Sequence, residues 1–294
     1  HQDEDTSASS AGFSTGSLAE MSNIVSFFKR RGRRQDRPLR DVAALVAPLS
    51  RQAIQLLVAS DRTPSHFGGG VLMSAKDWPC RDGKPLSLLA SIHLESLSEA
   101  VHLPWLPTTG RLLFFYDVES QPWGFDPKDR GGWAVLYVDD ETLAAPVSES
   151  SLPQRYISFR KIETYPSWER PEVALLKLSD AEADGLADVS GASCGNASPH
   201  QIGGYPSPIQ ADGMELECQL VSHGLYCGDS SGYNDPRAGE ISSGAIDWKL
   251  LLQVASDDEL GVMWGDMGML YFWIREHDAR AGRFDKTWVI LQCS

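Results

Sequence analysis

Residues 257–274, with the sequence D-D-E-L-G-V-M-W-G-D-M-G-M-L-Y-F-W-I, are the stretch around which the rest of the chain is organised. An acidic run leads through Trp264, Gly265 and Asp266 into the aromatic and aliphatic residues 270–274. Such a composition is typical of a strand covered on both faces. Gly265 and Gly268 suit positions of positive φ or close backbone approach. The stretch therefore predicts a polar loop beside a buried strand.

Length, composition and charge restrict the class of protein. The 294 residues can bury a substantial core in one large domain or two smaller ones. No apolar run approaches the roughly 18 residues of a membrane span, so we expect no integral membrane contact. The net charge of -14 argues against nucleic acid, because binding it requires Lys and Arg to neutralise phosphates. A basic partner is electrostatically favoured.

Cysteine usage and the N-terminal sequence favour a cytoplasmic location. Five Cys without paired short spacings fit a reducing compartment better than a disulfide framework, and no secretory signal pattern is present. Residues 1–37 are expected to form a disordered or basic extension, since residues 1–20 are rich in small, polar and acidic residues and residues 29–34 are rich in Lys and Arg. That basic run suits either a membrane surface or acidic partner, or the protein's own acidic body.

Helical and strand patterns alternate along the chain. Apolar residues at helical spacing predict a helix over residues 41–60, interrupted by Pro48. A second helix is predicted over residues 178–190, where Ser179 and Glu182 have capping-box spacing. Short apolar runs between Gly, Pro and Trp predict strands at residues 85–94, 110–116 and 133–138. Residues 146–171 mix strand-like pieces with prolines and are expected to form an edge or connector.

Five blocks of sequence recur in the same order in the two halves of the chain. Because five collinear matches are hard to obtain by chance, they predict an internal duplication. The fold class is therefore α+β, β-rich and internally duplicated, with two related antiparallel halves and peripheral helices. The expected parts are 38–146, a helix plus the first half; 147–199, a connector with a helix; and 200–294, the second half, all in one compact unit. The paired blocks are 68–69 with 203–204, 89–92 with 252–254, 110–115 with 268–273, 125–126 with 284–285, and 133–136 with 288–291.

Seven motifs carry a resemblance to a known family, at residues 78–79, 85–86, 123–131, 202–206, 217–228, 263–274 and 284–293. They resemble the YwqG-like family, a bacterial domain family of unknown function. The match covers roughly residue 60 to the end, and it implies a bacterial, cytosolic α+β protein with no agreed activity. Members placed in toxin and immunity gene neighbourhoods imply a protein-binding role of the immunity type. The chain departs from the family pattern at residues 70–74 and at Ser91, where the family has Gln, whereas Gln253 is kept in the second half.

Two loops carry the candidate ligand-binding residues. Residues 123–131 present Trp123, Asp126, Asp129 and Arg130, which suit either ligand binding or an Asp-capped turn with a local Asp to Arg pair. Trp264 and Asp266 lie in the second loop, and Asp266 is either a functional carboxylate or part of a solvated acidic turn. Both loops combine Trp, Gly and Asp, so we predict a ligand site where they approach each other.

Metal and catalytic signatures are weak. Cys218, His223 and Cys227 have ligand types for zinc, but no C-x2-C pair supports a site, and the alternative is a strand over residues 217–228 with small buried Cys. No cofactor is expected. The chain has no G-x-S-x-G, H-E-x-x-H or phosphate-loop motif. The leading hypothesis is thus a non-enzymatic binding protein with a protein partner; the alternative is a hydrolase or other enzyme that uses carboxylates with a bound cation.

Overall fold

The computed structural model describes residues 38–73, 77–139, 147–149, 151–194 and 200–294. The chain divides into two compact units, His1–Arg40 and Asp41–Ser294. The predicted extension over residues 1–37 lies outside the described residues. The second unit contains the fold and the cavities. In the described ranges, no helix is both long and apolar enough to cross a membrane.

A ten-stranded antiparallel sheet forms the second unit, in the order β14-β13-β12-β11-β1-β10-β2-β6-β7-β8. The strands expected at residues 85–94, 110–116 and 133–138 are confirmed, as is a β-rich antiparallel fold with helices. Two small two-stranded sheets pair β3 (Gly70–Leu72) with β9 (Val147–Glu149) and β4 (Cys80–Arg81) with β5 (Lys84–Pro85). The large sheet contains β1 (Arg51–Ala59), β2 (His66–Phe67), β6 (Ser87–His93), β7 (Arg111–Tyr116), β8 (Trp133–Val138), β10 (Arg155–Thr164), β11 (Gln201–Gly203), β12 (Trp248–Ala255), β13 (Met269–Arg275) and β14 (Trp288–Gln292).

The buried strand predicted from the deciding stretch is β13. It pairs with β12 on one side and β14 on the other, and its residues 269–274 are all buried. The ring of Phe272 packs edge-on against Phe114 of β7, with centroids 5.3 Å apart. Burial of consecutive residues requires cover on both faces, so the continuous aromatic run of β13 lies inside the main core.

The helix predicted over residues 41–60 is wrong for most of its length. Helix α2 (Val42–Val46) is capped by Asp41, and the 3-10 helix η1 (Ala47–Leu49) contains Pro48. Ser50 then turns to an extended conformation, and the chain continues as β1. Four consecutive residues of β1, 53–56, are buried, because both faces of the strand are covered. The apolar residues therefore do not alternate with polar ones, and their spacing matched that of a helix.

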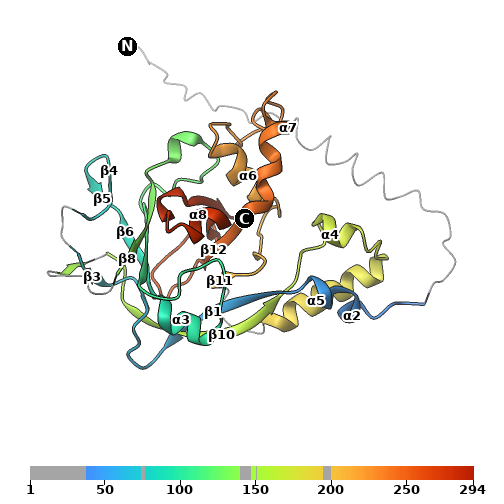
Figure 1. Cartoon of the computed structure of the whole chain (residues 1–294), viewed down its shortest axis with the longest axis horizontal. Helices are drawn as coiled ribbons and strands as arrows, with labels where there is room; N and C mark the ends of the chain where they lie inside the picture. The colour runs from blue at the N-terminus through green and yellow to red at the C-terminus, as the bar shows by residue number, and fades with distance from the viewer. Residues whose placement is uncertain (1–37, 74–76, 140–146, 150, 195–199) are drawn as a thin grey trace, which may run out of the picture. The chain divides into compact units, whose positions relative to one another are not determined.

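An edge or a connector is the expectation for residues 146–171, but β10 lies in the middle of the sheet, between β1 and β2. Figure 1 shows β10 running beside β1, and all nine residues of β1 pair with it. On its other side β10 pairs with β2. Pro153 and Pro166 lie just outside the strand, so neither removes a ladder hydrogen bond.

The second predicted helix is confirmed as α5 (Asp180–Cys194), which begins with the expected capping box. The Ser179 amide donates to Glu182 Oε2 at 2.8 Å, and the Glu182 amide donates to Ser179 Oγ at 3.3 Å. Helix α5 lies alongside α2 (Figure 1), and Leu186 joins Val46 in a small separate core.

Residues 217–228, expected to be a strand, begin inside helix α6 (Met214–Val221). Met214, Cys218 and Val221 are buried at spacings of four and three, so the helical period decides this element. The remaining helices are short: α3 (Leu94–Ala100), α4 (Pro171–Ala174), α7 (Ala238–Ile241), α8 (Glu276–Arg280), and the 3-10 helices η2 (Pro127–Asp129), η4 (Ser242–Asp247) and η5 (Phe284–Lys286).

The two edge strands of the large sheet touch at their first residues. The indole rings of Trp133 in β8 and Trp288 in β14 pack edge-on with centroids 5.0 Å apart. Trp133 Nε1 donates to the Thr287 carbonyl at 3.0 Å, and Trp288 Nε1 donates to the Gly124 carbonyl at 2.8 Å. These bonds place the 123–131 loop beside β14.

Candidate functional site

The 123–131 loop is held against β14 by its backbone. The Leu291 amide donates to the Trp123 carbonyl at 3.0 Å. Gly124 has a φ of +83°, and a Cβ there would lie 1.7 Å from the Val289 carbonyl oxygen, so only glycine fits this approach. Its amide donates to Asp129 Oδ2 at 2.8 Å. The loop is therefore rigid where it presents Trp123, whose side chain is 42% exposed.

The charged residues of this loop are engaged differently from the local Asp to Arg pair considered above. Asp126 Oδ1 accepts from the Lys128 amide at 2.9 Å and caps η2. Arg130 donates instead to the Thr287 carbonyl at 2.9 Å and to the Asp285 carbonyl. Burial lowers the pKa of the Arg130 guanidinium. Arg130 therefore anchors the loop to the segment before β14.

Trp264 and Asp266 lie in a neighbouring loop but outside the cavity beside Trp123. Trp264 is fully buried, edge-on to Tyr116 at 5.5 Å, whereas Asp266 is exposed. Gln121 joins the two loops: its Oε1 accepts from the Gly265 amide at 3.0 Å and its Nε2 donates to the Met263 carbonyl at 2.8 Å. Gln121, two residues before the 123–131 loop, thus contacts the second loop, and the shared ligand site stays a prediction.

A cavity of about 510 Å³ opens beside Trp123. It brings the 123–131 loop together with α6 and the segment that follows α6. The Cys227 amide donates to the Phe125 carbonyl at 2.8 Å and fixes the two walls to each other. We call this the Trp123 cavity; its lining residues are Trp123, Phe125, Asp126, Asp129, Gln210, Glu217, Tyr226, Cys227 and Gly228.

Glu217 is the carboxyl of the Trp123 cavity whose pKa is raised by burial. Its Oε1 accepts from the Tyr233 hydroxyl at 3.2 Å. Its Oε2 is buried and has no hydrogen-bond partner among the described residues. Burial raises the pKa of the carboxyl to about 7, against the hydrogen bond from Tyr233, which lowers it. Burial also raises the pKa of the Cys227 thiol to about 11, so this side chain stays protonated at neutral pH.

The lining of the Trp123 cavity is acidic and aromatic. Three carboxyl groups line it, those of Asp126, Asp129 and Glu217, and no Lys or Arg is among its lining residues. The Tyr226 side chain is 43% exposed and offers a second ring near Trp123. Carboxylates with exposed aromatic faces are suited to a cationic group. Glu217 and Tyr226 both belong to the sequence motif 217–228. The strand predicted for this motif did not indicate that their side chains line one cavity.

The weak metal candidates are not gathered around one point. Cys218 is fully buried on α6, and its surroundings raise the pKa of its thiol well above the usual range. His223 Nδ1 is bonded to the Gln219 carbonyl at 2.6 Å. Within the part of the chain that the structure describes, no three His, Cys, Asp or Glu side chains are placed to hold one metal ion.

Comparison with known proteins gives a family without an activity. A protein-family model described as "Domain of unknown function (DUF1963)" matches residues 65–293. A comparison with curated proteins finds no match. The family match covers every strand of the large sheet except β1. It also covers every residue that lines the Trp123 cavity.

Proposed function

We propose that this chain, which belongs to the family described as Domain of unknown function (DUF1963), is a non-enzymatic interaction protein that captures a cationic group. The observation that carries the proposal is the Trp123 cavity, with three carboxyl groups, two exposed rings and no basic lining residue. The partner is a basic protein whose Lys or Arg side chain enters the cavity. The net charge of -14 supports such a partner, because it attracts basic surfaces over long range.

The contacts of the cavity explain how a cation is retained. Asp126 and Asp129 each use one oxygen in a loop bond, so their other oxygens can face a ligand. Glu217 contributes its unpartnered Oε2, and a cation beside it favours the ionised carboxylate. The rings of Trp123 and Tyr226 add attraction of order 0.5–2 kcal/mol for a cation held over a ring face.

The test titrates the 15N-labelled full chain with the peptides Gly-Lys-Gly and Gly-Glu-Gly and follows the Trp123 indole N–H by NMR. Gly-Lys-Gly is expected to shift this resonance, whereas Gly-Glu-Gly leaves it in place. Binding of the lysine peptide, followed at backbone amides of 226–228, should weaken at least about fivefold in Trp123→Ala, since the ring contact is lost. Trp168→Ala is the matched control, because Trp168 is 68% exposed and is not a lining residue. Equal shifts from both peptides, or equal losses in both variants, contradict the proposal.

A second candidate function, acid–base catalysis, is favoured by the pKa of Glu217 near 7. A carboxyl that exchanges its proton near neutral pH can serve as general acid or base. The hydrolase alternative, with carboxylates and a bound cation, is tested by a broad hydrolase screen with and without Mg²⁺. Turnover that is lost in folded Glu217→Gln or Asp266→Asn protein would overturn the binding-only proposal. A stable basic partner without turnover supports it.

We also propose that the sheet arose by internal duplication. From its two ends inward, the sheet contains β8-β7-β6-β2 and β14-β13-β12-β11, with β10 and β1 between them. The paired sequence blocks lie on or next to β2 and β11, β6 and β12, β7 and β13, η2 and η5, and β8 and β14. Both β6 and β12 carry a register shift at the same relative place, between Leu88 and Ala90 and between Leu250 and Leu252.

Hydrogen bonds support the same correspondence at atomic level. The Leu56 amide donates to the His200 carbonyl at 2.9 Å, and the Ile157 amide donates to the Ser65 carbonyl at 2.9 Å. In the central pair of strands, Leu56 of β1 pairs with Phe159 of β10, and Val58 of β1 pairs with Ile157 of β10. A two-fold axis between β1 and β10 that relates Leu56 to Ile157 requires this register, because it also relates Val58 to Phe159. Superposing residues 65–140 on 200–293 in an experimental structure tests the proposal. Blocks that miss their partner strands would contradict it.

The finer assignments follow from the resemblance and stay proposals. The motifs support membership of the YwqG-like family, a bacterial source and an immunity-type role, in which the basic partner would be a toxin. The cytoplasmic location rests on cysteine usage, and Cys80, Cys218, Cys227 and Cys293 are free. Co-purification of the full chain with its native partner would test the immunity role. A partner whose contact surface is acidic would contradict the role as proposed.

A further inference from the structure

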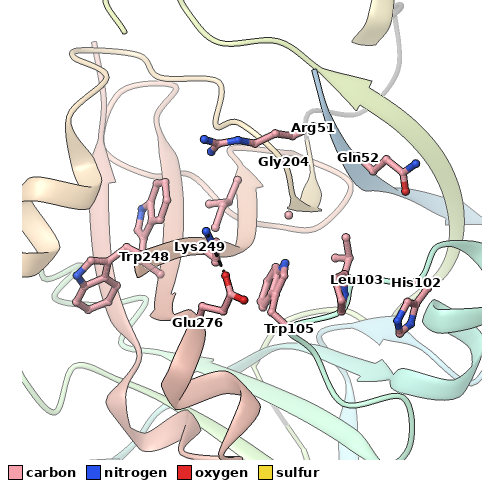
Figure 2. Close-up of a pocket in the computed structure, with 13 residues that line it drawn as sticks. Arg51, Gln52, His102, Leu103, Trp105, Gly204, Trp248, Lys249 and Glu276 are labelled. Carbon is pink, nitrogen blue, oxygen red and sulfur yellow. Dashed lines mark ion pairs between the residues drawn. The ribbon is translucent and has the colours of Figure 1, made fainter. Parts of the chain in front are cut away.

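A second cavity, of about 320 Å³, lies where β1, β11 and β12 meet the 102–105 segment and α8 (Figure 2). We propose that this cavity binds a small organic anion, with its carboxylate or phosphate group on Arg51 and Lys249 and its apolar body against Trp105. The cavity shares no lining residue with the Trp123 cavity. We call it the Arg51 cavity.

Arg51 supplies a guanidinium held in place by an aromatic ring. Its Cζ lies 3.9 Å from the centroid of the Tyr205 ring. Among the described residues no carboxylate forms an ion pair with Arg51, so the donor fork is available to an oxyanion. In Figure 2 the charged ends of Arg51, Lys249 and Glu276 gather in the same part of the cavity. A guanidinium stacked on a ring loses less freedom when it binds carboxylate or phosphate.

Lys249 supplies a second positive charge that is only partly compensated. Its Nζ lies 3.3 Å from Glu276 Oε2. The same carboxylate accepts from Arg280 Nη2 at 2.7 Å and Nε at 3.0 Å. One carboxylate thus serves two cations, and with Arg51 the local charge is positive. In a chain with a net charge of -14, such a locally positive cavity selects an anion against the charge of the whole protein.

The walls of the Arg51 cavity suit an apolar body. Trp105, Trp248 and Trp273 line it and are 8%, 2% and 1% exposed. Trp248 Nε1 donates to Gln219 Oε1 at 2.8 Å, but the buried Trp273 Nε1 has no acceptor among the described residues. A bound ligand oxygen would satisfy that donor. The volume lies at the lower end of the range for small-molecule sites, which favours a ligand with a single ring.

Gly203, the last residue of β11, and Gly204, which follows it, shape one wall of the Arg51 cavity. Gly203 and Gly204 both have positive φ, +73° and +74°. A Cβ at Gly204 would lie 2.4 Å from Thr164 Oγ1, so the backbone can come this close only without a side chain. A Cβ at Gly203 would lie 3.0 Å from Leu103 Cδ1, so the missing side chain leaves the space beside Leu103 open to a ligand.

The experiment titrates the 15N-labelled full chain with benzoate, inorganic phosphate and benzylamine, observing indole N–H resonances. Benzoate is expected to shift the resonances of Trp105 and Trp273, and to bind at least about tenfold more tightly than inorganic phosphate or benzylamine. Equal binding of benzylamine would overturn the anion preference. Equal binding of inorganic phosphate would overturn the role of the apolar body, and with it the assignment of an organic anion. Shifts confined to tryptophans outside the cavity would overturn the site.

Variants separate the two cations from general charge effects. Arg51→Met and Lys249→Met should each weaken benzoate binding at least about fivefold, while Arg62→Met, an exposed control outside the lining, should leave it unchanged. Circular dichroism checks folding, and if Arg51→Met fails to fold, Lys249→Met alone decides. Unchanged benzoate affinity in a folded variant, or an equal loss in Arg62→Met, overturns the proposal. Neither result depends on the lysine peptide in the Trp123 cavity, so the two proposals fail separately.

Discussion

At the scale of single residues, Glu217 couples the Trp123 cavity to pH. Its pKa in the folded chain, about 7, is higher than the ordinary value of 4.5. A raised folded-state pKa contributes stability that is fully present below the unfolded value and is lost as the pH rises through the folded value. The window for this effect therefore runs from about pH 4.5 to pH 7. Above that window the folded protein holds a buried carboxylate.

Replacing Glu217 by Gln should remove this pH dependence. The amide keeps the shape and an acceptor for Tyr233 but cannot ionise. Between pH 5 and pH 8, the free energy of unfolding of the native chain should fall relative to Glu217→Gln by up to about 3 kcal/mol. Urea unfolding at the two pH values measures the difference. Parallel pH profiles for the two proteins would show that the carboxyl titrates near its ordinary pKa.

Gly124 offers a residue-scale test of how firmly the loop is held. Gly124→Ala should lower the free energy of unfolding by at least about 2 kcal/mol, because the new Cβ strikes the Val289 carbonyl. Gly131→Ala in the same loop is a matched control, since its φ is also positive but nothing lies within 4 Å of a Cβ there. It should cost only about 1 kcal/mol of backbone strain. Equal losses measured by thermal unfolding would mean that the clash at Gly124 relaxes.

At the scale of elements, sequence patterns predicted the strands that contain several aromatic residues. They failed for β1, a strand of mainly aliphatic residues that is buried on both faces. β7 and β13 contain runs of three consecutive aromatic residues, and β8 contains Trp133 and Tyr137; such residues are enriched in strands. In β1, by contrast, Ala53, Ile54 and Leu57 fit a helical stripe, and only pairing with β10 and β11 decides in favour of a strand. Such distant pairing leaves little signal in a local window. The same limit affected the candidate site, because Glu217 and Tyr226 line a cavity only once α6 is a helix.

Helix α5 gives an element-scale prediction. Ser179→Ala removes the side-chain oxygen that accepts from the Glu182 amide, and it should lower the free energy of unfolding by about 1 kcal/mol. Ser98→Ala serves as the control, because its hydroxyl donates to a carbonyl of the short helix α3 in an exposed position. Hydrogen exchange of amides at 180–184 should speed up in the first variant alone. Unchanged exchange there would contradict a capping role for Ser179.

At the scale of the whole second unit, the two sequence halves share one core. Phe114 and Phe272 are both fully buried and come from β7 and β13, which are distant in the sheet order. A double-mutant cycle with Phe114→Leu and Phe272→Leu should give a coupling of about 0.5–1.5 kcal/mol in urea unfolding. A second cycle pairing Phe114→Leu with Phe284→Leu is the reference and should couple less. Equal coupling in the two cycles would contradict a specific ring contact between the halves.

The 123–131 loop also affects how copies of the protein behave toward each other. An uncovered edge strand is a template on which another chain can add a strand, which leads to aggregation. Here the Leu291 amide of β14 is already bonded to Trp123, and Trp133 of the other edge strand packs against Trp288. The loop that presents the exposed Trp123 ring thus also shields an edge from strand addition. A change that loosens the loop would therefore promote self-association of the protein.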